Sequence, residues 1–348
     1  MADGDIDPQL LLFRRQYLQL FEPDFLAWPP LKLLRSGDAQ LWLFRQLFDE
    51  NRNDKLPPER YQMRILKPLV ARIERAIEDP NEDEVSDELV THLAHLMTKG
   101  VPSEFQAMQE KAYVAFTCLP EARGSDESSS SEPRITLLER RNLISGSRTT
   151  GFRTWEAALH LGSYLLTSPG AELVCGKNVL ELGAGTGFLT ILCAKVLGAK
   201  HVTTTDGDGG VIESLDENLQ LNDLDDGERV MTNTLWWGEE LKGTWVEDDC
   251  SKAPYDVVIG ADITYDKDAI RALVKTLQHL FDMRPKLMAI IAGVVRNAET
   301  FQTFQEECSQ RNFTVTEVAF EAKPMREQKA LFYAAAVPIK ILIITNPA

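Results

Sequence analysis

The feature that most constrains the fold of this chain is an apolar run that opens directly into three alternating glycines. Residues 179–187 read Val-Leu-Glu-Leu-Gly-Ala-Gly-Thr-Gly, and a helical pattern follows from Phe188 to Leu197. A short apolar run bounded by glycines predicts a buried strand. Glycines at its end allow a tight turn and a close approach of the backbone to a ligand. We therefore expect a strand, a ligand-binding loop and a helix, in that order.

Further β-rich runs follow along the chain and alternate with helical segments. The expected strands are Asn178–Leu182, His201–Thr205, Arg229–Thr234, Asp256–Ala261, Leu287–Ala292, Thr314–Phe320 and Ile339–Thr345. The expected helices between them are Phe188–Leu197, Gly210–Leu221, Asp268–Phe281 and Ala298–Arg311. This alternation predicts an α/β fold with a seven-stranded, doubly wound, Rossmann-like sheet. A sheet of this kind binds its ligand at the carboxyl ends of the strands.

The amino-terminal third has a different texture. Apolar residues recur at a spacing of three and four from Pro8 to about Leu119, which predicts four to six short helices. Residues 124–133 are polar and rich in serine, and they contain nothing that would anchor a core, so we expect a flexible linker. The expected organisation is an all-helical domain over 1–123, for substrate recognition or structural support, the linker, and the α/β domain over 134–348.

Charge and composition exclude several classes of protein. The formal net charge of −16, without a dense Lys/Arg block, disfavours a nucleic-acid partner. It is compatible with a basic substrate segment, although ordinary solubility is the favoured explanation. The five cysteines are scattered without a CxxC pair, so we expect reduced thiols and no metal site. No apolar stretch approaches the roughly 20 residues that cross a membrane, and the acidic amino terminus does not resemble a secretory signal. We expect a monomeric cytoplasmic protein with no membrane contact.

The spacing of the glycines limits the classes of ligand that the loop can bind. A dinucleotide fingerprint requires Gly-x-Gly-x-x-Gly, but Phe188 or Thr190 falls at the last position, depending on where the count starts. The chain lacks a Gly-Lys-Ser/Thr for nucleotide phosphates, and an anionic Glu181 would repel them. A zwitterionic aminoacyl group suits the loop better. Asp206, at the end of the second expected strand, can accept hydrogen bonds from both hydroxyls of a ribose; the alternative is that it caps the next helix.

Residues 181–187 together with Asp206 resemble the seven-β-strand class of S-adenosylmethionine-dependent methyltransferases, and the resemblance extends over roughly residues 135–348. It implies S-adenosylmethionine as cofactor, with the glycine loop against its methionine part and the acid on its ribose. It also implies that the loop after the third strand lines the adenine. There, Trp236 and Trp237 offer aromatic faces to a purine, although either ring would also suit the core. The implied cofactor-binding residues are Trp155, Glu181, Gly183, Ala184, Gly185, Thr186, Gly187, Asp206, Trp236, Trp237 and Ala261.

The segment after the fourth expected strand bears on the methyl acceptor. It lacks the Asn/Asp-Pro-Pro-aromatic motif of enzymes that methylate base amines, and it lacks a cysteine for cytosine C5 chemistry. Asp262-x-x-Tyr265 is instead similar to the Asp-x-x-Tyr motif of family-16 protein methyltransferases, most of whose known members modify lysine. Residues 151–158 match that family's Gly-x-x-x-Trp-x-x-Ala segment, and residues 235–238 match its Leu-x-Trp-Gly segment. Three motifs in order make coincidence improbable.

This resemblance implies a protein-lysine N-methyltransferase. It is strongest to the members that modify translation elongation factor 2, which also carry a long helical amino-terminal region and a similar late loop, here Glu321 to Tyr333. The resemblance therefore implies elongation factor 2 as the protein partner. Asp262 is expected to guide and orient the lysine, and Tyr265 to aim the amine through its hydroxyl or its ring.

Other interpretations remain open at this point. Asp262 would also suit the cap of a helix starting near Lys267, Tyr265 would suit packing on the sheet, and Trp155 would suit a gap between the helical and the α/β region. Fold does not determine substrate, so another protein or a small metabolite is an alternative acceptor. A further alternative is a cofactor-binding adaptor or chaperone, which the intact glycine loop, Asp206 and Asp262 disfavour.

Overall fold

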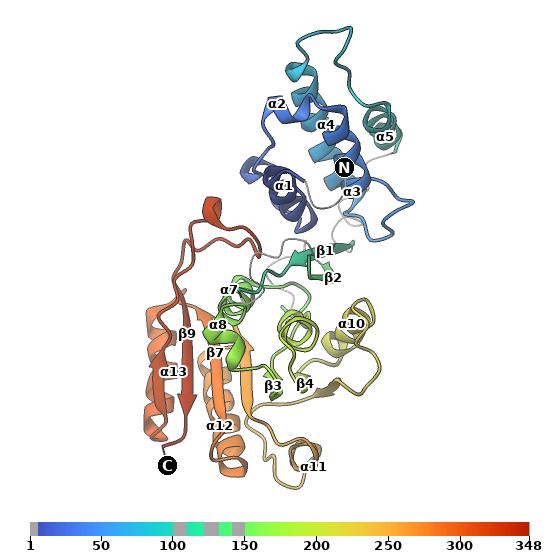
Figure 1. The fold of residues 1–348 in the computed structure, drawn as a ribbon. Helices are drawn as coiled ribbons and strands as arrows, with labels where there is room; N and C mark the ends of the chain where they lie inside the picture. The colour runs from blue at the N-terminus through green and yellow to red at the C-terminus, as the bar shows by residue number, and fades with distance from the viewer. Residues whose placement is uncertain (1–5, 100–109, 122–131, 141–149, 348) are drawn as a thin grey trace. The chain divides into compact units, whose positions relative to one another are not determined.

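The computed structural model describes residues 6–99, 110–121, 132–140 and 150–347. Its contacts divide the chain into two compact units, Met1–Thr117 with Ser125–Ser145, and Cys118–Gly124 with Gly146–Ala348 (Figure 1). Among the described residues, no helix is both long enough and apolar enough to cross a membrane. The described side chains also contain no cluster of three or more potential metal ligands.

Unit 1 consists mainly of helices around its own core. They are α1 (Pro8–Leu18), the 3-10 turn η1 (Pro23–Phe25), α2 (Leu31–Leu34), α3 (Gly37–Leu47), α4 (Glu59–Ala76) and α5 (Asp87–Thr98). The carboxylate of Asp7 begins α1 by accepting a hydrogen bond from the backbone nitrogen of Gln9 at 2.8 Å. The expected apolar stripes meet in a core in which Phe13, Tyr17 and Ile65 are fully buried. Full burial of each such side chain stabilises the fold by about 1.5–3 kcal/mol.

The helical pattern expected as far as Leu119 ends earlier than predicted. Residues 111–117 form β1 (Lys111–Thr117), which pairs antiparallel with β2 (Arg134–Arg140). The physical reason is a period of two: Ala112, Val114 and Phe116 are buried while the residues between them are not. Both strands belong to unit 1. The boundary expected at residue 134 had placed the residues of β2 in the same domain as the large sheet, whereas β2 lies outside that unit.

Most of the expected linker over 124–133 lies outside the described residues. Its described end is held in unit 1, because the carboxylate of Glu132 pairs with Arg14 at 2.6 Å and also with Arg15. Burial of Glu132 opposes its ionised form, but the two arginines outweigh this effect and lower the pKa of the carboxyl.

Unit 2 contains a seven-stranded sheet, as the sequence predicts. Its strands are β3 (Asn178–Leu182), β4 (His201–Asp206), β5 (Val230–Thr234), β6 (Val257–Ala261), β7 (Met288–Val294), β8 (Thr314–Glu317) and β9 (Ile339–Thr345). The order across the sheet is β5-β4-β3-β6-β7-β9-β8. Strands β3 to β7 pair in parallel, whereas β9 is antiparallel to both of its neighbours. The strand order reverses direction at β3, which is where such sheets bind ligands.

Helices cover the sheet on both faces, since the five central residues of β7 are all buried although alternate side chains point to opposite faces. The helices of unit 2 are α7 (Glu156–Leu165), α8 (Ser168–Glu172), α9 (Phe188–Ile191) with its π-helical continuation η2 (Leu192–Val196), α10 (Gly209–Gln220), α11 (Trp245–Lys252), α12 (Lys267–Met283), α13 (Ala298–Gln310) and the 3-10 turn η3 (Met325–Glu327). The four predicted helices are confirmed. Figure 1 shows α12 and α13 side by side along the sheet.

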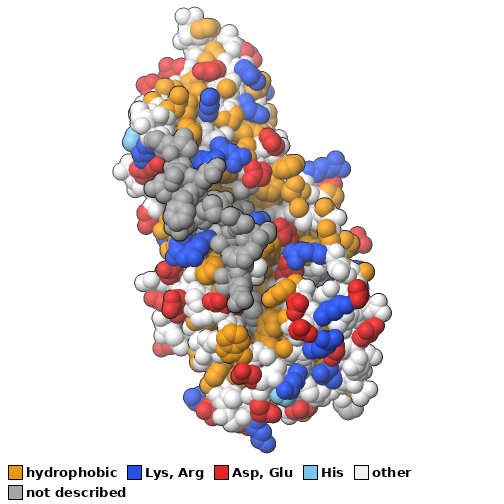
Figure 2. All heavy atoms as spheres, turned by 180° about the vertical axis from the view of Figure 1, so that it is seen from behind, with side chains coloured by type: hydrophobic (Ala, Val, Ile, Leu, Met, Phe, Trp, Pro, Cys, Tyr) orange, Lys and Arg blue, Asp and Glu red, His pale blue; other side chains and the backbone are white. Residues whose placement is uncertain are grey.

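The surface of the chain mixes both signs of charge. Figure 2 shows Lys and Arg side chains interspersed with Asp and Glu on the face that it draws. The net charge of −16 is therefore not gathered into one continuous acidic patch on that face.

Candidate functional site

The glycine loop after β3 has a backbone conformation that only glycine adopts readily. Gly183, Gly185 and Gly187 have φ angles of 68°, 54° and 81°. A Cβ on Gly187 would lie 2.1 Å from Cδ1 of Leu215 in α10, and one on Gly183 would lie 2.6 Å from Cγ2 of Ile263. The glycines therefore serve both the turn and the close packing of the elements around it.

Hydrogen bonds to acceptors on β4 hold this loop in place. The backbone nitrogen of Ala184 donates to the carbonyl of Thr205 at 2.9 Å. The nitrogen of Gly185 donates to Oδ2 of Asp206 at 3.1 Å. The loop is thus preorganised by the neighbouring strand.

Asp206 lies where the sequence predicts, at the end of β4 and beside the glycine loop. Besides Gly185, its carboxylate accepts a hydrogen bond from the backbone nitrogen of Asp208 at 3.2 Å. Asp208, not Asp206, caps α10, since its carboxylate accepts from the nitrogens of Gly210 and Val211. The helix-cap alternative for Asp206 is therefore wrong. Burial raises the pKa of Asp206, although the backbone donors oppose this effect.

Glu181 differs from its expected role as an anion beside the loop. Its side chain is 2% exposed and accepts a hydrogen bond from the hydroxyl of Thr190 in α9. Burial raises the pKa of this carboxyl to about 8. Glu181 is consequently mainly neutral at pH 7. The expectation that an ionised Glu181 repels phosphates is therefore wrong.

The segment before α7 packs against the glycine loop. The carbonyl oxygen of Gly151 lies 3.2 Å from the position that a Cβ on Gly185 would take. The hydroxyl oxygens of Thr154 and Thr186 are 2.7 Å apart and buried. The Gly-x-x-x-Trp segment recognised in the sequence is thereby brought to the ligand loop.

The two tryptophans of the loop after β5 have different surroundings. Trp237 is partly buried against the core, and its ring lies 3.3 Å from the position of a Cβ on Gly183. Trp236 is 62% exposed, and its ring lies 3.9 Å from the position of a Cβ on Gly207, the residue after Asp206. The accessible aromatic face beside Asp206 is therefore that of Trp236, whereas Trp237 also serves the core.

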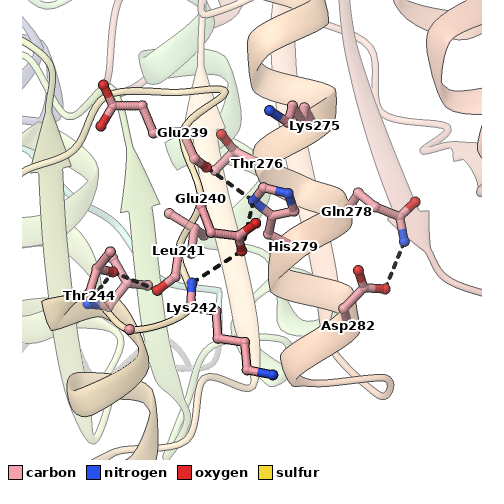
Figure 3. Close-up of polar contacts among 12 residues, drawn as sticks. Glu239, Glu240, Leu241, Lys242, Thr244, Lys275, Thr276, Gln278, His279 and Asp282 are labelled. Atoms are coloured by element: carbon pink, nitrogen blue, oxygen red, sulfur yellow. Dashed lines mark hydrogen bonds and ion pairs between the residues drawn. The ribbon is translucent and has the colours of Figure 1, made fainter.

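Helix α12 holds the tryptophan loop in place through contacts with the backbone of residues 238 and 239, and Figure 3 shows the contact between His279 and Glu239. The backbone nitrogen of Gly238 donates to Oγ1 of Thr276 at 2.8 Å, and Lys275 donates to the carbonyl of Gly238 at 2.7 Å. His279 lies one turn further along the helix, with Nδ1 3.0 Å from the carbonyl of Glu239. No sequence motif indicated these three anchors, because they lie on a helix far from the loop in sequence.

Asp262 follows β6 in a left-handed conformation, with a φ of 57°. Its backbone nitrogen donates to the carbonyl of Ala292 at 2.8 Å, which fixes the residue against the end of β7. Its Oδ2 lies 2.7 Å from Nη2 of Arg296. Asp266 caps α12 by accepting from two backbone nitrogens of its first turn, so the interpretation of Asp262 as the cap is wrong. A strained residue at the end of a central strand indicates a functional position.

Tyr265 lies on the same loop, with 63% of its surface exposed. The alternative that it packs on the sheet is therefore wrong. Partial burial, together with the carboxylates of Asp266 and Asp206, raises the pKa of its hydroxyl, which is neutral at pH 7. Ala261, the last residue of β6, pairs with Ala292 of β7 at this edge of the sheet.

Arginines surround Trp155, the last residue before α7. The guanidinium carbons of Arg153 and Arg296 lie 5.4 and 5.8 Å from the centroid of its ring. The indole nitrogen donates to the carbonyl of Thr150 at 3.0 Å. Arg296 was not identified from the sequence, since it belongs to no motif; its one signal is its position just beyond a central strand.

These residues fit S-adenosylmethionine. A glycine loop without side chains suits the aminoacyl part, the carboxylate of Asp206 suits the ribose hydroxyls, and the exposed ring of Trp236 suits a purine. All of them lie at the carboxyl ends of β3, β4 and β5, around the point where the strand order reverses. The fold and the site together define a Rossmann-like methyltransferase that uses S-adenosylmethionine.

Comparison with known proteins identifies the family. The family model described as lysine methyltransferase matches residues 141–311. Protein-lysine N-methyltransferase EFM3 of Chaetomium thermophilum is 46% identical over 335 residues, covering 96% of this chain and 97% of that protein. EFM3 of Saccharomyces cerevisiae is 34% identical over 61% of this chain and 66% of its own length. Human protein-lysine N-methyltransferase EEF2KMT is 31% identical over 61% of this chain and 64% of its own.

The chain therefore belongs to the lysine methyltransferase family, and it is an S-adenosylmethionine-dependent protein-lysine N-methyltransferase. Among solved structures, the methyltransferase domain of bacterial CtHen1 superposes with a TM-score of 0.40 at 17% identity, covering 55% of this chain and 98% of that domain. A similarity this low adds nothing to the assignment, which rests on the sequence relatives.

Proposed function

We propose that this enzyme methylates a lysine of translation elongation factor 2 in the cytoplasm, with Asp262 and Tyr265 as the residues that receive the lysine. The resemblance of its motifs to enzymes that modify elongation factor 2 supports the choice of acceptor. Its similarity over nearly the full chain to a protein-lysine methyltransferase supports a protein rather than a metabolite as substrate.

The observation that carries the acceptor site is the pairing of an ionisable carboxylate with an exposed tyrosine on the loop after β6. The side chain of Asp262 is only 11% exposed, whereas Tyr265 is 63% exposed. On the proposed route, the lysine side chain enters past the exposed ring of Tyr265, and its amine reaches the less exposed Asp262. This arrangement suits lysine, which combines a thin apolar stem with a cationic tip.

Methyl transfer requires the protein to align the acceptor amine with the methyl group and to receive that amine in its neutral form. Bound S-adenosylmethionine supplies a methyl group on a good leaving group. The side chains of this chain orient the amine in line with it and exclude water. The unperturbed pKa of lysine is about 10.4, and its protonated form has no lone pair, so the proton must leave to solvent before transfer. Asp262 positions the nitrogen, and no strong general base is required.

Incubation with radiolabelled S-adenosylmethionine and an extract of cells that lack the enzyme tests the acceptor. We expect one labelled protein band at the size of elongation factor 2, with the label on lysine by mass spectrometry. Label confined to other proteins, small molecules or RNA would contradict this acceptor. Cofactor binding without any label would favour an adaptor role.

The acceptor residues are tested separately with Asp262→Ala. We expect a loss of turnover of at least tenfold with unchanged affinity for S-adenosylmethionine, since positioning of a reacting group is worth at least this much. Asp268→Ala is the matched control, because Asp268 is an acid in the first turn of α12 whose side chain is 91% exposed and pairs with Arg271. Undiminished turnover of Asp262→Ala would remove the assignment.

A further inference from the structure

Arg296 is placed where it affects the acceptor. Its Nη2 lies 2.7 Å from Oδ2 of Asp262, and its guanidinium carbon lies 5.8 Å from the ring centroid of Trp155. The backbone reinforces the contact, because the nitrogen of Val294 lies 3.4 Å from the other carboxylate oxygen of Asp262. Arg296 lies between the end of β7 and the start of α13, both of which have defined positions.

This ion pair alters what an incoming lysine meets. A lone buried carboxylate stabilises an ammonium and raises its pKa, which would hold the lysine in the unreactive form. A guanidinium does not lose its proton in proteins, so it cancels that charge at every pH of interest. Transfer requires the lone pair of the lysine nitrogen to form the new C–N bond, while the electron pair of the C–S bond leaves with sulfur.

We propose that Arg296 is a positioning residue that neutralises Asp262, so that Asp262 orients the acceptor lysine by hydrogen bonding without retaining it as an ammonium. The inference rests on the proposed acceptor site at Asp262. It adds to that site the residue that sets its charge balance.

The other charged groups around the pair, among the described residues, are already engaged. Arg153 contacts Trp155 and Glu156. Its guanidinium carbon lies 5.4 Å from the ring centroid of Trp155, and its Nη2 lies 3.8 Å from the carboxylate of Glu156. The oxygens of Asp266 accept from the first turn of α12. Those of Asp206 accept from Gly185 and Asp208. Tyr265 is neutral, because its pKa is raised. Arg296 is therefore the described cation that contacts Asp262.

The pH dependence of methyl transfer tests the proposal. The full-length protein is mixed with labelled S-adenosylmethionine and the extract of cells that lack the enzyme, and single-turnover label on protein lysine is followed against pH. Arg296→Gln leaves Asp262 unneutralised, so we expect the midpoint of the rising limb to move up by about one pH unit or more. Arg296→Lys keeps the charge and should restore a midpoint close to that of the unmodified enzyme.

The double variant distinguishes charge balance from a structural role. Asp262→Asn combined with Arg296→Gln removes both charges, so its midpoint should return toward that of the unmodified enzyme, even if the rate stays low. Arg153→Gln is the matched control, since it removes the other guanidinium beside Trp155 and should leave the midpoint unmoved. Affinity for S-adenosylmethionine, measured by calorimetry, reports whether each variant is folded.

The outcomes separate the two proposals. A lower rate at every pH with an unmoved midpoint in Arg296→Gln would overturn the role of Arg296 while leaving the acceptor site intact. Label on a protein other than elongation factor 2 would contradict the proposed acceptor, and the midpoints measured on that protein would still decide the role of Arg296. A shifted midpoint in Arg153→Gln of the same size would also overturn it, since the effect would not depend on contact with Asp262.

Discussion

At the scale of single residues, two glycines with similar backbone conformations have different surroundings. Gly176 and Gly187 have φ angles of 69° and 81°. A Cβ on Gly176 would meet nothing within 4 Å, whereas one on Gly187 would overlap Leu215. Alanine substitutions at these two positions therefore separate the cost of backbone strain from the cost of a steric clash.

We expect Gly176→Ala to lower the free energy of unfolding by about 1 kcal/mol, which is the cost of a left-handed conformation alone. Gly187→Ala should lower it by about 3 kcal/mol, because displacement of Leu215 adds the cost of overpacking. Urea denaturation measures both values. Gly187→Ala should also weaken the binding of S-adenosylmethionine, and equal losses in the two variants would contradict this account.

Glu181 predicts a pH dependence of stability. Its pKa is raised to about 8 in the folded chain by burial, from an ordinary value of 4.5. The folded state therefore keeps a proton that the unfolded state releases above about pH 4.5, and stability is lost as the pH rises toward 8. Glu181→Gln keeps an acceptor for Thr190 and cannot ionise.

This variant should therefore gain stability relative to the unmodified chain as the pH rises. The gain should be small at pH 5 and as much as about 4 kcal/mol at pH 8, since each pKa unit is worth about 1.4 kcal/mol. Urea denaturation at both pH values measures it. A gain that is the same at pH 5 and pH 8 would mean that Glu181 is ionised in the folded state.

Much of the candidate site was predictable from the sequence, because its residues follow directly after apolar strands. Asp206 and Asp262 were located in this way, at the carboxyl ends of β4 and β6. The protonated state of Glu181 was not predictable, since the alternation of a strand does not reveal how deeply a residue is desolvated. Arg296 was missed because its contact with Asp262 joins two loops that are 34 positions apart.

At the scale of elements, the loop that carries the two tryptophans depends on α12. Thr276 is fully buried, and its hydroxyl accepts the hydrogen bond from the backbone of Gly238. Thr276→Val keeps the shape of the side chain but leaves that N–H without its partner, a loss of about 1 kcal/mol. We expect the affinity for S-adenosylmethionine to fall about fivefold by calorimetry.

A matched control lies on the same helix. Gln278 is half-buried and bonds to Asp282, one turn away, so Gln278→Ala should leave the affinity unchanged (Figure 3). If the two variants behaved alike, the anchor between Thr276 and Gly238 would have no part in cofactor binding.

The elements themselves were predicted with uneven success for identifiable reasons. Strands β3 and β9 have the predicted bounds, because each is a mainly apolar run of which most residues are buried. β1 was missed because its alternating residues lie in a region dominated by helical spacing. β8 was predicted too long, as its four residues are mostly exposed at the edge of the sheet and the pattern beyond them continues without a strand partner.

At the scale of the whole molecule, each of the two units has its own hydrophobic core. The residues that fit S-adenosylmethionine lie entirely in unit 2. A ligand stabilises only the folded state that it contacts, by about 2.7 kcal/mol at a hundredfold excess over its dissociation constant.

We therefore expect differential scanning calorimetry to resolve two unfolding transitions, of which S-adenosylmethionine raises one. Inosine, which keeps a purine and a ribose but lacks the aminoacyl part, is the control and should raise that transition less than S-adenosylmethionine does. A single transition that the cofactor raises as a whole would show that the units unfold together.

The position of β9 has a consequence for biosynthesis. β9 is the sole strand partner of β8 in this sheet, and it also covers one edge of β7. Until residues 339–345 have left the ribosome, β8 therefore has no strand partner, and the apolar edge of β7 that β9 covers is open as well. Unpaired strand edges are templates for association with other chains. A nascent chain held with residues 339–345 still inside the ribosome should therefore be more prone to aggregation than the released chain, and it should depend more strongly on chaperones that bind emerging polypeptides.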